Sequence, residues 1–448
     1  MEQSKNAGGL ATTITDKQGF LWDIGAHVIF SHYAYFTGLL DIALVPEEWS
    51  VKRREAWVWM RDTYTPYPLQ RKLYRLPEDE IIRCIDGLLE VEKKRLTFSK
   101  PRTFRDWLEQ AFGKGLCETF MFPYNFKVWA CSPENMNVEW MGERVATVDI
   151  SKVIANVIKK KDDGGWGPNS TFRYPKHGGT GAIWRGLYKK LPAKNFHFSK
   201  NVTSIDAKKK EVTYSDGTSE HYDAIVSTMP LDCLCRIVKE TRIPSDILQQ
   251  KAALFRYSSS HIVGFGMNGQ PPSFLQDKTW LYFPEDNCPF YRVSIFSNFA
   301  SDNVPMPGKQ WSLMCEIAES IDKPIDHDHV TEIAEQGLKS TKIIDDQTEI
   351  VSRFHTRLEH GYPTPFYGRD PLCQEISDEL EVFHIYSRGR FGAWKYEVAN
   401  QDHSVMQGVE VIDNILFGTE EMTLKHPNIV NQNKDINGRR PLPVSFLS

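Results

Sequence analysis

The sequence lacks the cysteine spacing of a zinc ribbon or of a secreted disulfide framework. Its eight cysteines are scattered over 448 residues, and no two of them form a C-x-x-C pair. Such a distribution is typical of reduced thiols in an intracellular protein. We therefore predict a cytoplasmic (cytosolic) location, where the N-x-[ST] sequons at Asn169 and Asn201 carry no glycan.

The sequence also lacks a long apolar run and an excess of one charge. No stretch approaches the length of a membrane span, and the first residues do not form the charged-then-apolar pattern of a secretory signal. The formal net charge is −4. The short lysine runs at 159–161 and 208–210 fit solvated loops. These features exclude a general binder of nucleic acid or of anionic membranes.

Several catalytic signatures are missing as well. The sequence has no G-x-S-x-G or Ser/His/Asp pattern, no group of side chains at metal-ligand spacing, and no internal repeat. We therefore predict no metal in the site. The length of 448 residues, with 41% hydrophobic and 25% charged residues, predicts a globular protein. A chain of this length has room for about two or three domains.

What the sequence does contain is a glycine-rich opening at residues 8–33. Two adjacent glycines, a turn at 16–19, a short apolar strand and then Gly25-Ala26-His27 would let the backbone approach a large flat ligand. In dinucleotide-binding chains such a segment follows a strand, a G-x-G-x-x-G turn and a helix. Only residues 1–7 precede it here, so we expect that anchoring unit to be missing from this chain.

The rest of the chain alternates between helical and strand patterns. Helix signals dominate residues 77–140, with starts at Pro77 and Thr103, and the glycines at 178–181 open another helix. Ser215-Asp216-Gly217 is a hairpin turn signal. Alternating strands fill most of 257–357, interrupted by a helix near 329–340. This interleaved order predicts a mixed α/β fold in which one nucleotide-binding domain carries a helical insertion and an antiparallel-sheet insertion.

Three arginines stand in unusual surroundings. Arg144, Arg292 and Arg390 have glycine or aromatic neighbours, and a guanidinium so placed can grip a phosphate or diphosphate through two hydrogen bonds. Each could equally neutralise a buried carboxylate. His27 could face a cofactor or serve a structural role. Several aromatic residues could pack in a core or stack on a sugar or base ring: Tyr67, Trp129, Trp280, Tyr282, Tyr362 and Tyr396.

Taken together, these segments resemble one family, the eukaryotic-type UDP-galactopyranose mutases, which are flavoenzymes of the wider amine-oxidase-like FAD group. The similarity spans nearly the whole chain in order. Its most particular motif is the run WLYFPEDNCPFYR at 280–292. The matching segments are 8–33, 65–70, 116–145, 165–184, 279–299, 360–365 and 387–404.

The resemblance implies a mixed α/β fold built on an FAD-binding, Rossmann-like domain of the GR2 type. Its N-terminal strand, G-x-G-x-x-G turn and helix would be absent, which we attribute to an incomplete or alternative N-terminus. The implied domains are an FAD-binding domain at 1–45, 178–250 and 360–448, a helical substrate domain at 46–150, and an antiparallel sheet domain at 151–177 and 251–359.

The resemblance also implies an isomerase that interconverts UDP-galactopyranose and UDP-galactofuranose with no net redox change. In that family the N5 atom of reduced FAD attacks the anomeric carbon of the sugar and displaces UDP. The resulting flavin–sugar adduct opens and closes again as the five-membered ring, and UDP then returns. NADPH or NADH reduces the flavin, and Arg53 or Arg54 would lie near that nucleotide. The partner is then a small nucleotide-sugar, with no nucleic acid and no membrane, and an assembly of identical chains is left open.

Each position that matches a family motif takes an implied role. The catalytic positions are His27, Arg144, Arg292 and Arg390, of which Arg292 and Arg390 hold the diphosphate. The substrate positions are Tyr282, Tyr362, Tyr396 and Asn400 near the diphosphate, Tyr67, Gln70, Phe120, Asn125, Trp129 and Trp280 on the uridine side, and Asn169 near the sugar. The cofactor positions are Gly8, Gly9, Leu10, Thr12, Gly25, Ala26, His27, Val202, Asn400, Gln401 and Ser404.

Two substitutions depart from the family pattern. Ala26 replaces a glycine beside His27, and Ala399 replaces one before Asn400. A methyl group would cost about 1 kcal/mol wherever the backbone needs φ > 0. Two other functions stay open: a catalytically inactive UDP-sugar-binding remnant without stably bound FAD, and an amine-oxidase-like flavin oxidoreductase.

Overall fold

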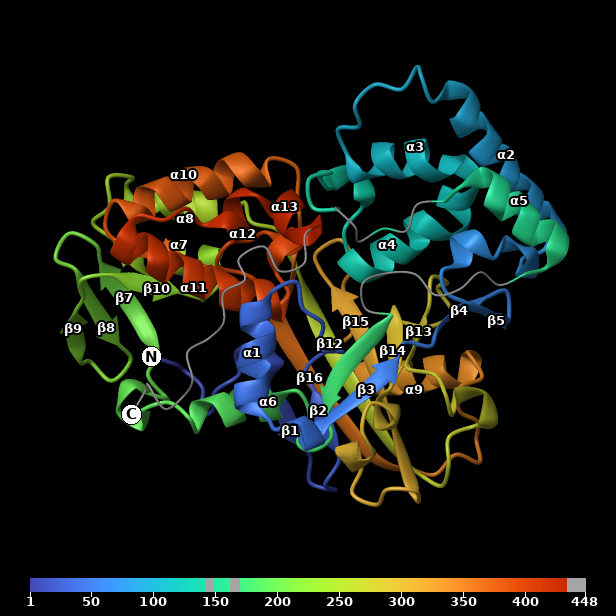
Figure 1. Ribbon diagram of the computed structural model, residues 1–448, viewed down its shortest axis with the longest axis horizontal. Coiled ribbons are helices and arrows are strands. Elements are labelled where there is room, and N and C mark those ends of the chain that lie inside the picture. The colour runs from blue at the N-terminus through green and yellow to red at the C-terminus, as the bar shows by residue number, and fades with distance from the viewer. Residues whose placement is uncertain (142–144, 146–147, 162–169, 433–448) are drawn as a thin grey trace.

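The computed structural model describes residues 1–141, 145, 148–161 and 170–432 of the chain. Figure 1 shows three groups of elements, of which the middle one is a sheet of long strands. Helices from residues 78–159 gather at the upper right, long strands from residues 257–363 run through the middle, and a second group of strands and helices lies at the left. The mixed α/β fold predicted from the sequence is confirmed.

Seven strands of the described chain form one sheet: β4 (Ala56–Met60), β5 (Thr63–Pro66), β12 (Tyr257–Asn268), β13 (Trp280–Tyr282), β14 (Arg292–Ile295), β15 (Gln310–Glu319) and β16 (Ile350–Pro363). Their order is β16-β12-β15-β14-β13-β4-β5. Neighbours are antiparallel except β13 and β4, which are parallel. Ten consecutive residue pairs set the register between β12 and β15.

Both faces of this sheet are covered. On one face α9 (Val330–Ser340) packs on β12 and β16 and closes a hydrophobic cluster. The other face packs against Phe20, which directly precedes β2 (Leu21–Asp23), and against Trp22, which lies within that strand. As a result β12 and β15 are buried along nearly their whole length. The sequence alternation at 261–266 therefore does not mark a solvent-exposed face.

The helical group consists of α2 (Glu78–Lys94), α3 (Phe104–Leu116), a π-helical turn η5 (Cys117–Met121), α4 (Phe122–Trp129) and α5 (Ile150–Lys159). The predicted start at Thr103 is confirmed by a capping box. The Asp106 backbone N–H donates to Thr103 Oγ1 at 3.1 Å, and the Thr103 N–H donates to the Asp106 carboxylate at 3.0 Å.

Residues 46–150 contribute strands as well as helices. β4 and β5 lie in the central sheet, and β3 (Trp49–Arg53) pairs with β6 (Thr171–Pro175) in a separate ribbon. Residues 49–67 are basic and aromatic in sequence, a composition that does not by itself predict strands. These strands were missed because their partners lie far away in the sequence, so local periodicity carries little signal for them.

The remaining group is a second α/β unit. Its sheet has the order β11-β7-β8-β9, and β10 pairs with β17 in parallel. The turn predicted at 215–217 is confirmed as the hairpin between β8 and β9. Its strands are β7 (Val202–Asp206), β8 (Glu211–Tyr214), β9 (Ser219–His221), β10 (Ile225–Ser227), β11 (Val238–Lys239) and β17 (Ile385–Ser387).

Helices of this unit pack around those strands and around the N-terminal hairpin. That hairpin pairs β1 (Thr13–Thr15) with β2. Among the described residues no helix combines the length and the apolar character that crossing a membrane requires. The helices are α1 (Ala34–Ala43), α6 (Gly181–Tyr188), α7 (Leu231–Ile237), α8 (Ser245–Ala252), α10 (Arg369–Glu381), α11 (Gln401–Phe417), α12 (Met422–Lys425) and α13 (Pro427–Gln432).

Two glycines on β12 make room for the aromatic rings that cover the sheet. A Cβ added at Gly264 would lie 2.6 Å from Cε3 of Trp22, and one at Gly266 would lie 2.5 Å from Cζ of Phe20. Both rings are completely buried. The absence of side chains at these two positions is therefore what lets the N-terminal hairpin seat against the sheet.

We expect Gly264→Ala to destabilise the protein by about 1–3 kcal/mol, because overpacking forces the buried Trp22 ring to move. Gly408→Ala is the matched control. It lies inside α11, where an added Cβ meets no atom within 4 Å, and alanine favours a helix by up to about 1 kcal/mol. Thermal melting should show a lower midpoint for Gly264→Ala and an equal or higher one for Gly408→Ala. Equal midpoints for the two variants would contradict this packing argument.

Candidate active site

Three polar residues lie abreast on adjacent strands of the central sheet. Tyr282 on β13 is paired with Arg292 on β14, and Arg292 is paired with Glu316 on β15. Directly paired residues point to the same face of a sheet. Arg292 donates from Nη2 to Glu316 Oε1 at 2.8 Å and from Nε to Oε2, so the contact is bidentate. The strand register therefore places a cation and an anion together on this face.

Glu316 also holds the loop that contains His27. The backbone N–H of Ala26 donates to Glu316 Oε1 at 3.1 Å. Gly25 adopts φ +135°, a conformation that favours glycine, and the His27 N–H then donates to the Gly25 carbonyl at 2.9 Å. Thr180 Oγ1 donates to the His27 carbonyl at 2.9 Å. The loop is thus fixed from both sides, by Glu316 and by the start of α6.

The His27 ring is kept neutral by its surroundings. Burial, which is the largest cause, acts together with the positive charges of Arg390 and Arg292 to lower the pKa of His27 from 6.5 to about 4, and the negative charge of Glu316 partly opposes them. Its Nδ1 is buried and has no hydrogen-bond partner among the described residues. A neutral imidazole offers one donor and one acceptor, so this ring can bind a polar ligand atom without adding charge.

Arg390 brings a positive charge to the same place from a distant part of the chain. It follows Gly389, whose φ is +89°. Its guanidinium donates to the carbonyls of Ala399 and Gly361 at 3.3 and 3.2 Å. It also lies 4.9 Å from the ring centre of Tyr362. Within the described residues it contacts no carboxylate, so its charge remains available to an anion.

Tyr362 connects the two arginines. It lies near the end of β16, and burial raises the pKa of its hydroxyl, while the charges of Arg292 and Arg390 both act in the opposite direction. Arg390 is also 5.6 Å from the ring centre of Tyr396. The structure therefore brings Arg292, Arg390, Tyr362 and Tyr396 into one cluster, which we call the arginine–tyrosine cluster.

Aromatic rings extend this cluster in two directions. Trp129 lies edge-on to Tyr396 and Tyr362, with ring centres 4.7 and 5.8 Å apart. On the other side Tyr67 lies 5.0 Å from Tyr282. The indole N–H of Trp280 donates to the Tyr282 hydroxyl at 2.7 Å. Five of the six aromatic residues singled out in the sequence thus contact one another in these two groups, and Trp280 joins them through its hydrogen bond.

Three further substrate positions, Phe120, Asn125 and Gln70, lie on short helices and helical turns. Phe120 lies on η5, and its ring centre is 5.4 Å from that of Tyr124. The ring centre of Tyr124 is in turn 5.5 Å from that of Tyr282, so Tyr124 connects Phe120 to Tyr282. Asn125 of α4 donates to the Met121 carbonyl at 2.7 Å, and Gln70 is buried on η3 (Leu69–Arg71). The predicted positions Arg144 and Asn169 lie outside the described residues.

The predicted cofactor positions lie on the N-terminal turn and at the start of α11. Gly8 and Gly9 have φ of +125° and +50° and lead into η1 (Gly9–Ala11), whose C-cap is Thr12. Leu10 and Val202 pack against the same hydrophobic cluster. Two glycines of this type allow the backbone to come close to a flat ligand.

Helix α11 begins at Gln401 without a side-chain cap, after Asn400 in the N-cap position, and Ser404 lies in its first turn. Uncapped N–H groups at a helix N-terminus favour an anionic or electron-rich partner. Ala399 has φ −113°. Ala26 is likewise absent from the residues with positive φ. The two departures from the family pattern therefore cause no left-handed strain.

Three acidic residues that support this region were not singled out from the sequence: Asp23, Glu316 and Asp402. Asp23 is buried, and Tyr174, Thr180 and Thr13 donate to it. Asp402 accepts from the backbone N–H of His32 at 3.0 Å. In the sequence one signal marks Asp23 and Glu316, an acidic residue inside an apolar run, as in Met314-Cys315-Glu316-Ile317. Asp402 stands among polar residues and carries no such signal.

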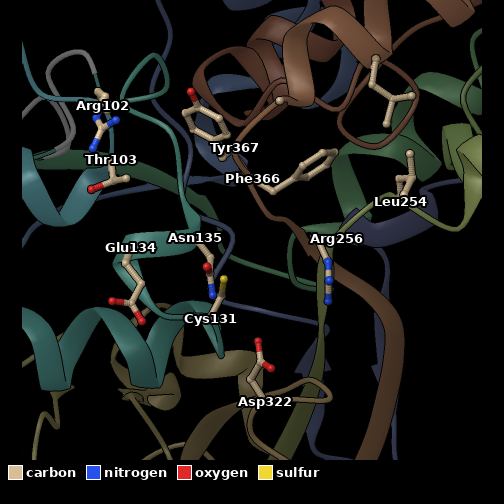
Figure 2. A pocket seen from close by; sticks show the side chains of 12 residues that line it. Arg102, Thr103, Cys131, Glu134, Asn135, Leu254, Arg256, Asp322, Phe366 and Tyr367 are labelled. Carbon is tan, nitrogen blue, oxygen red and sulfur yellow. The ribbon is translucent and has the colours of Figure 1, made fainter.

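A separate cavity of about 800 Å³ lies where the helical group meets the start of β12 and the loop before α10. Figure 2 shows Arg102, Glu134, Arg256 and Asp322 around it, with Cys131 between them. Its lining includes none of the site residues predicted from the sequence. Because its charges are mixed and its residues lie apart from the arginine–tyrosine cluster, we base the candidate site on that cluster.

The chain is similar to known flavoproteins over most of its length. The family model for flavin containing amine oxidoreductases matches residues 1–382. A solved structure of reduced UDP-galactopyranose mutase is 44% identical, covers 96% of this chain and 91% of its own, and superposes with a TM-score of 0.93. A protein from Exiguobacterium sp. described as a protoporphyrinogen oxidase has 14% identity, 92% coverage of both chains and a TM-score of 0.67.

A fatty acid isomerase from P. acnes is 10% identical, covers 93% of this chain and 92% of its own, and has a TM-score of 0.59. At such identities the likeness concerns the fold alone. The fold and the family match together show that the chain belongs to the family of flavin containing amine oxidoreductases. Within that class, the 44% identity over nearly the whole chain shows that the protein belongs to the UDP-galactopyranose mutase family.

The residues present fit the FAD that this class contains. His27 Nδ1 is a buried polar atom whose partner is not among the described residues. The turn at Gly8 and Gly9 exposes backbone at left-handed φ, and the start of α11 is uncapped. A flavin ring offers the polar edge atoms and the flat apolar face that such groups can bind.

The surroundings of His27 generate a measurable prediction. Since its pKa is about 4, we expect the His27 ring to stay neutral at pH 5.5, where exposed histidines are largely protonated. Replacing Arg390 by alanine should raise this pKa, because one nearby cation no longer opposes protonation. NMR of the histidine-labelled chain reads both values, and a His27→Gln variant identifies the signal. Arg353→Ala is the control, since Arg353 pairs with Glu335 elsewhere. A pKa near 6.5 for His27 would contradict this description of the site.

Proposed function

We propose that the protein is an isomerase that interconverts UDP-galactopyranose and UDP-galactofuranose without net redox change, and that it is of the eukaryotic type. The arginine–tyrosine cluster carries this proposal. It offers the guanidinium and hydroxyl donors that a diphosphate recruits. The 44% identity to a UDP-galactopyranose mutase supports the substrate class.

In this proposal the two arginines act differently on the diphosphate. Glu316 already balances the charge of Arg292, so Arg292 contributes mainly directed N–H donors. Arg390 donates only to carbonyls and pairs with no carboxylate among the described residues, so it supplies the net attraction. Tyr282, Tyr362 and Tyr396 would donate hydroxyl protons to the same group. The positions assigned to the uridine side are Tyr67, Gln70, Phe120, Asn125, Trp129 and Trp280, with Asn400 near the diphosphate and Arg144 and Asn169 near the sugar.

FAD would be held by the N-terminal turn, the Gly25–Ala26–His27 loop, Val202 and the start of α11. When bound and reduced, it supplies a nucleophilic N5 for the anomeric carbon of the sugar. Neutral His27 would bind a polar atom of the ring system through Nδ1 without adding charge. Glu316 and Thr180 orient the loop that presents His27.

A nicotinamide nucleotide, NADPH or NADH, is the proposed reductant. Arg53 and Arg54 lie on and after β3, and the Arg54 guanidinium stacks on Tyr67 at 5.5 Å from its ring centre. The side chain of Arg53 is 79% exposed, so it can reach a second nucleotide from solvent. Two arginines beside the aromatic wall suit a phosphate-containing reductant.

The domain division and the location are part of the same proposal. Separate hydrophobic clusters in the central sheet, the helical group and the second α/β unit support a division into three domains, although β4 and β5 of the predicted helical segment 46–150 join the central sheet. All eight cysteines fall in the described part of the chain and are free thiols. Free thiols of this number support a reducing compartment, the cytosol.

An assay of the full chain tests the proposal. Purified protein supplied with FAD and dithionite should convert UDP-galactofuranose to UDP-galactopyranose, and chromatography of the nucleotide-sugars follows the product. Flavin absorbance of the same sample should show stoichiometric FAD. Protein that retains flavin but gives no pyranose contradicts the mutase assignment, and peroxide formation from amines would indicate an oxidase instead. Protein that binds UDP but no flavin would indicate a binding remnant.

Arginine substitutions test the diphosphate site separately from the chemistry. We expect Arg390→Ala to weaken UDP binding by about 2 kcal/mol, roughly 30-fold, because it removes a charge-assisted contact. Arg292→Ala should weaken it at least as much, since Glu316 is then left unpaired beside the ligand. Arg353→Ala, on the far side of β16, should bind UDP as the unsubstituted chain does. Isothermal titration measures all three, and unchanged affinity in both site variants would remove these arginines from the substrate site.

A further inference from the structure

A second polar cluster lies on the opposite face of the central sheet. Glu319 follows Glu316 on β15 by three residues, so its side chain points to the other face. His261 of β12 contacts Glu319 Oε2 through Nε2 at 3.1 Å. His327, in the loop between β15 and α9, contacts Glu319 Oε1 through Nε2 at 2.5 Å. Two imidazoles and one carboxylate thus meet at a single point.

We propose that these three side chains form a binding site for a divalent transition metal ion, with Zn²⁺ as the preferred ion. Imidazole nitrogen and carboxylate oxygen are common zinc ligands, and three protein ligands leave a fourth position for water. The candidate atoms of His261, Glu319 and His327 all lie within 4.8 Å of one another. Tetrahedral zinc separates its ligand atoms by roughly 3.4 Å, so only a small movement of the half-exposed His327 is needed.

His355 strengthens this assignment from outside the ligand set. Its Nε2 lies 3.0 Å from His261 Nδ1, and the two rings are stacked. When His261 binds a metal through Nε2, its proton sits on Nδ1 and is donated to His355. Metal-ligating histidines ordinarily have such a partner, which sets the tautomer and the ring orientation.

The charges around the cluster also suit a cation. Arg357 donates from Nε to Glu319 Oε2 at 2.6 Å, which leaves Oε1 for the metal. The positive charge of Arg357 is balanced by Glu359, to which it donates from Nη1. Arg357, Glu359 and Glu319 together therefore carry a net negative charge, which comes from Glu319. Arg357 is then a positioning residue that holds the carboxylate in place.

The site is accessible and independent of the candidate active site. The side chain of His327 is 50% exposed, whereas that of His261 is fully buried and that of Glu319 is 12% exposed. A metal ion can therefore reach the buried ligands past His327. The cluster shares no residue with the arginine–tyrosine cluster, so its failure and the failure of the mutase proposal are separate outcomes.

The experiment uses the full chain, purified without a histidine tag, stripped with EDTA and freed of chelator. Calorimetric titration with ZnCl₂ at pH 7.5 should show one equivalent bound. His327→Ala should lower the affinity at least tenfold, and His355→Ala should lower it about tenfold, as loss of an outer partner does. His221→Ala is the matched control, because His221 is an exposed histidine on β9 that contacts only a backbone carbonyl among the described residues.

Each outcome decides the proposal. Absence of saturable zinc binding by the unsubstituted chain overturns it, and so does equal affinity in His327→Ala and His221→Ala. Metal-free melting curves show whether His327→Ala is folded, which its exposure leads us to expect. If it is not, Co²⁺ titration of the unsubstituted chain replaces it. Visible bands of a tetrahedral nitrogen–oxygen site support the proposal, and their absence overturns it.

Discussion

The candidate site depends on one buried ion pair, between Arg292 and Glu316. Removing two charges from water costs several kcal/mol per ion, and the attraction between them offsets this only when the geometry is good and the remaining hydrogen-bonding positions are filled. Both conditions hold, because the contact is bidentate and the Ala26 N–H takes a further position on the carboxylate. Such a pair contributes less to stability than to placement. It holds Arg292 on β14, and it holds the His27 loop against the sheet.

The charge balance of the site follows from that pair. Once Glu316 neutralises Arg292, and burial beside two cations keeps His27 uncharged, Arg390 is left as the net charge of the cluster. A single uncompensated cation surrounded by tyrosines and tryptophan favours an anion that also presents flat or polar rings. A nucleotide diphosphate has both properties. The same balance disfavours a cationic amine as substrate, because nothing described in the cluster carries a net negative charge.

Local signals in the sequence predicted more of the fold than of the site. The helix starts at Pro77 and Thr103 and the hairpin at 215–217 depend on neighbouring residues, so composition reveals them. Strands β3, β4 and β5 depend on partners far along the chain and were missed. The two interpretations of the arginines illustrate the limit, because both apply: Arg292 does neutralise a buried carboxylate, whereas Arg390 contacts carbonyls. Only strand register distinguishes them, and register between distant strands is not encoded in local spacing.

Strand register also explains how β15 contributes a carboxylate to a polar cluster on each face of the sheet. Glu316 and Glu319 are separated by an odd number of positions on β15, so the first faces the arginine–tyrosine cluster and the second faces the histidines. A slip of one residue would bury each carboxylate against the wrong partners and leave Arg292 beside an apolar side chain. The ten paired residues of β12 and β15, together with the rings of Phe20 and Trp22 seated on Gly264 and Gly266, oppose such a slip. The glycines and the two carboxylates therefore belong to one constraint: the side chains that cover the sheet set the register on which both polar clusters depend.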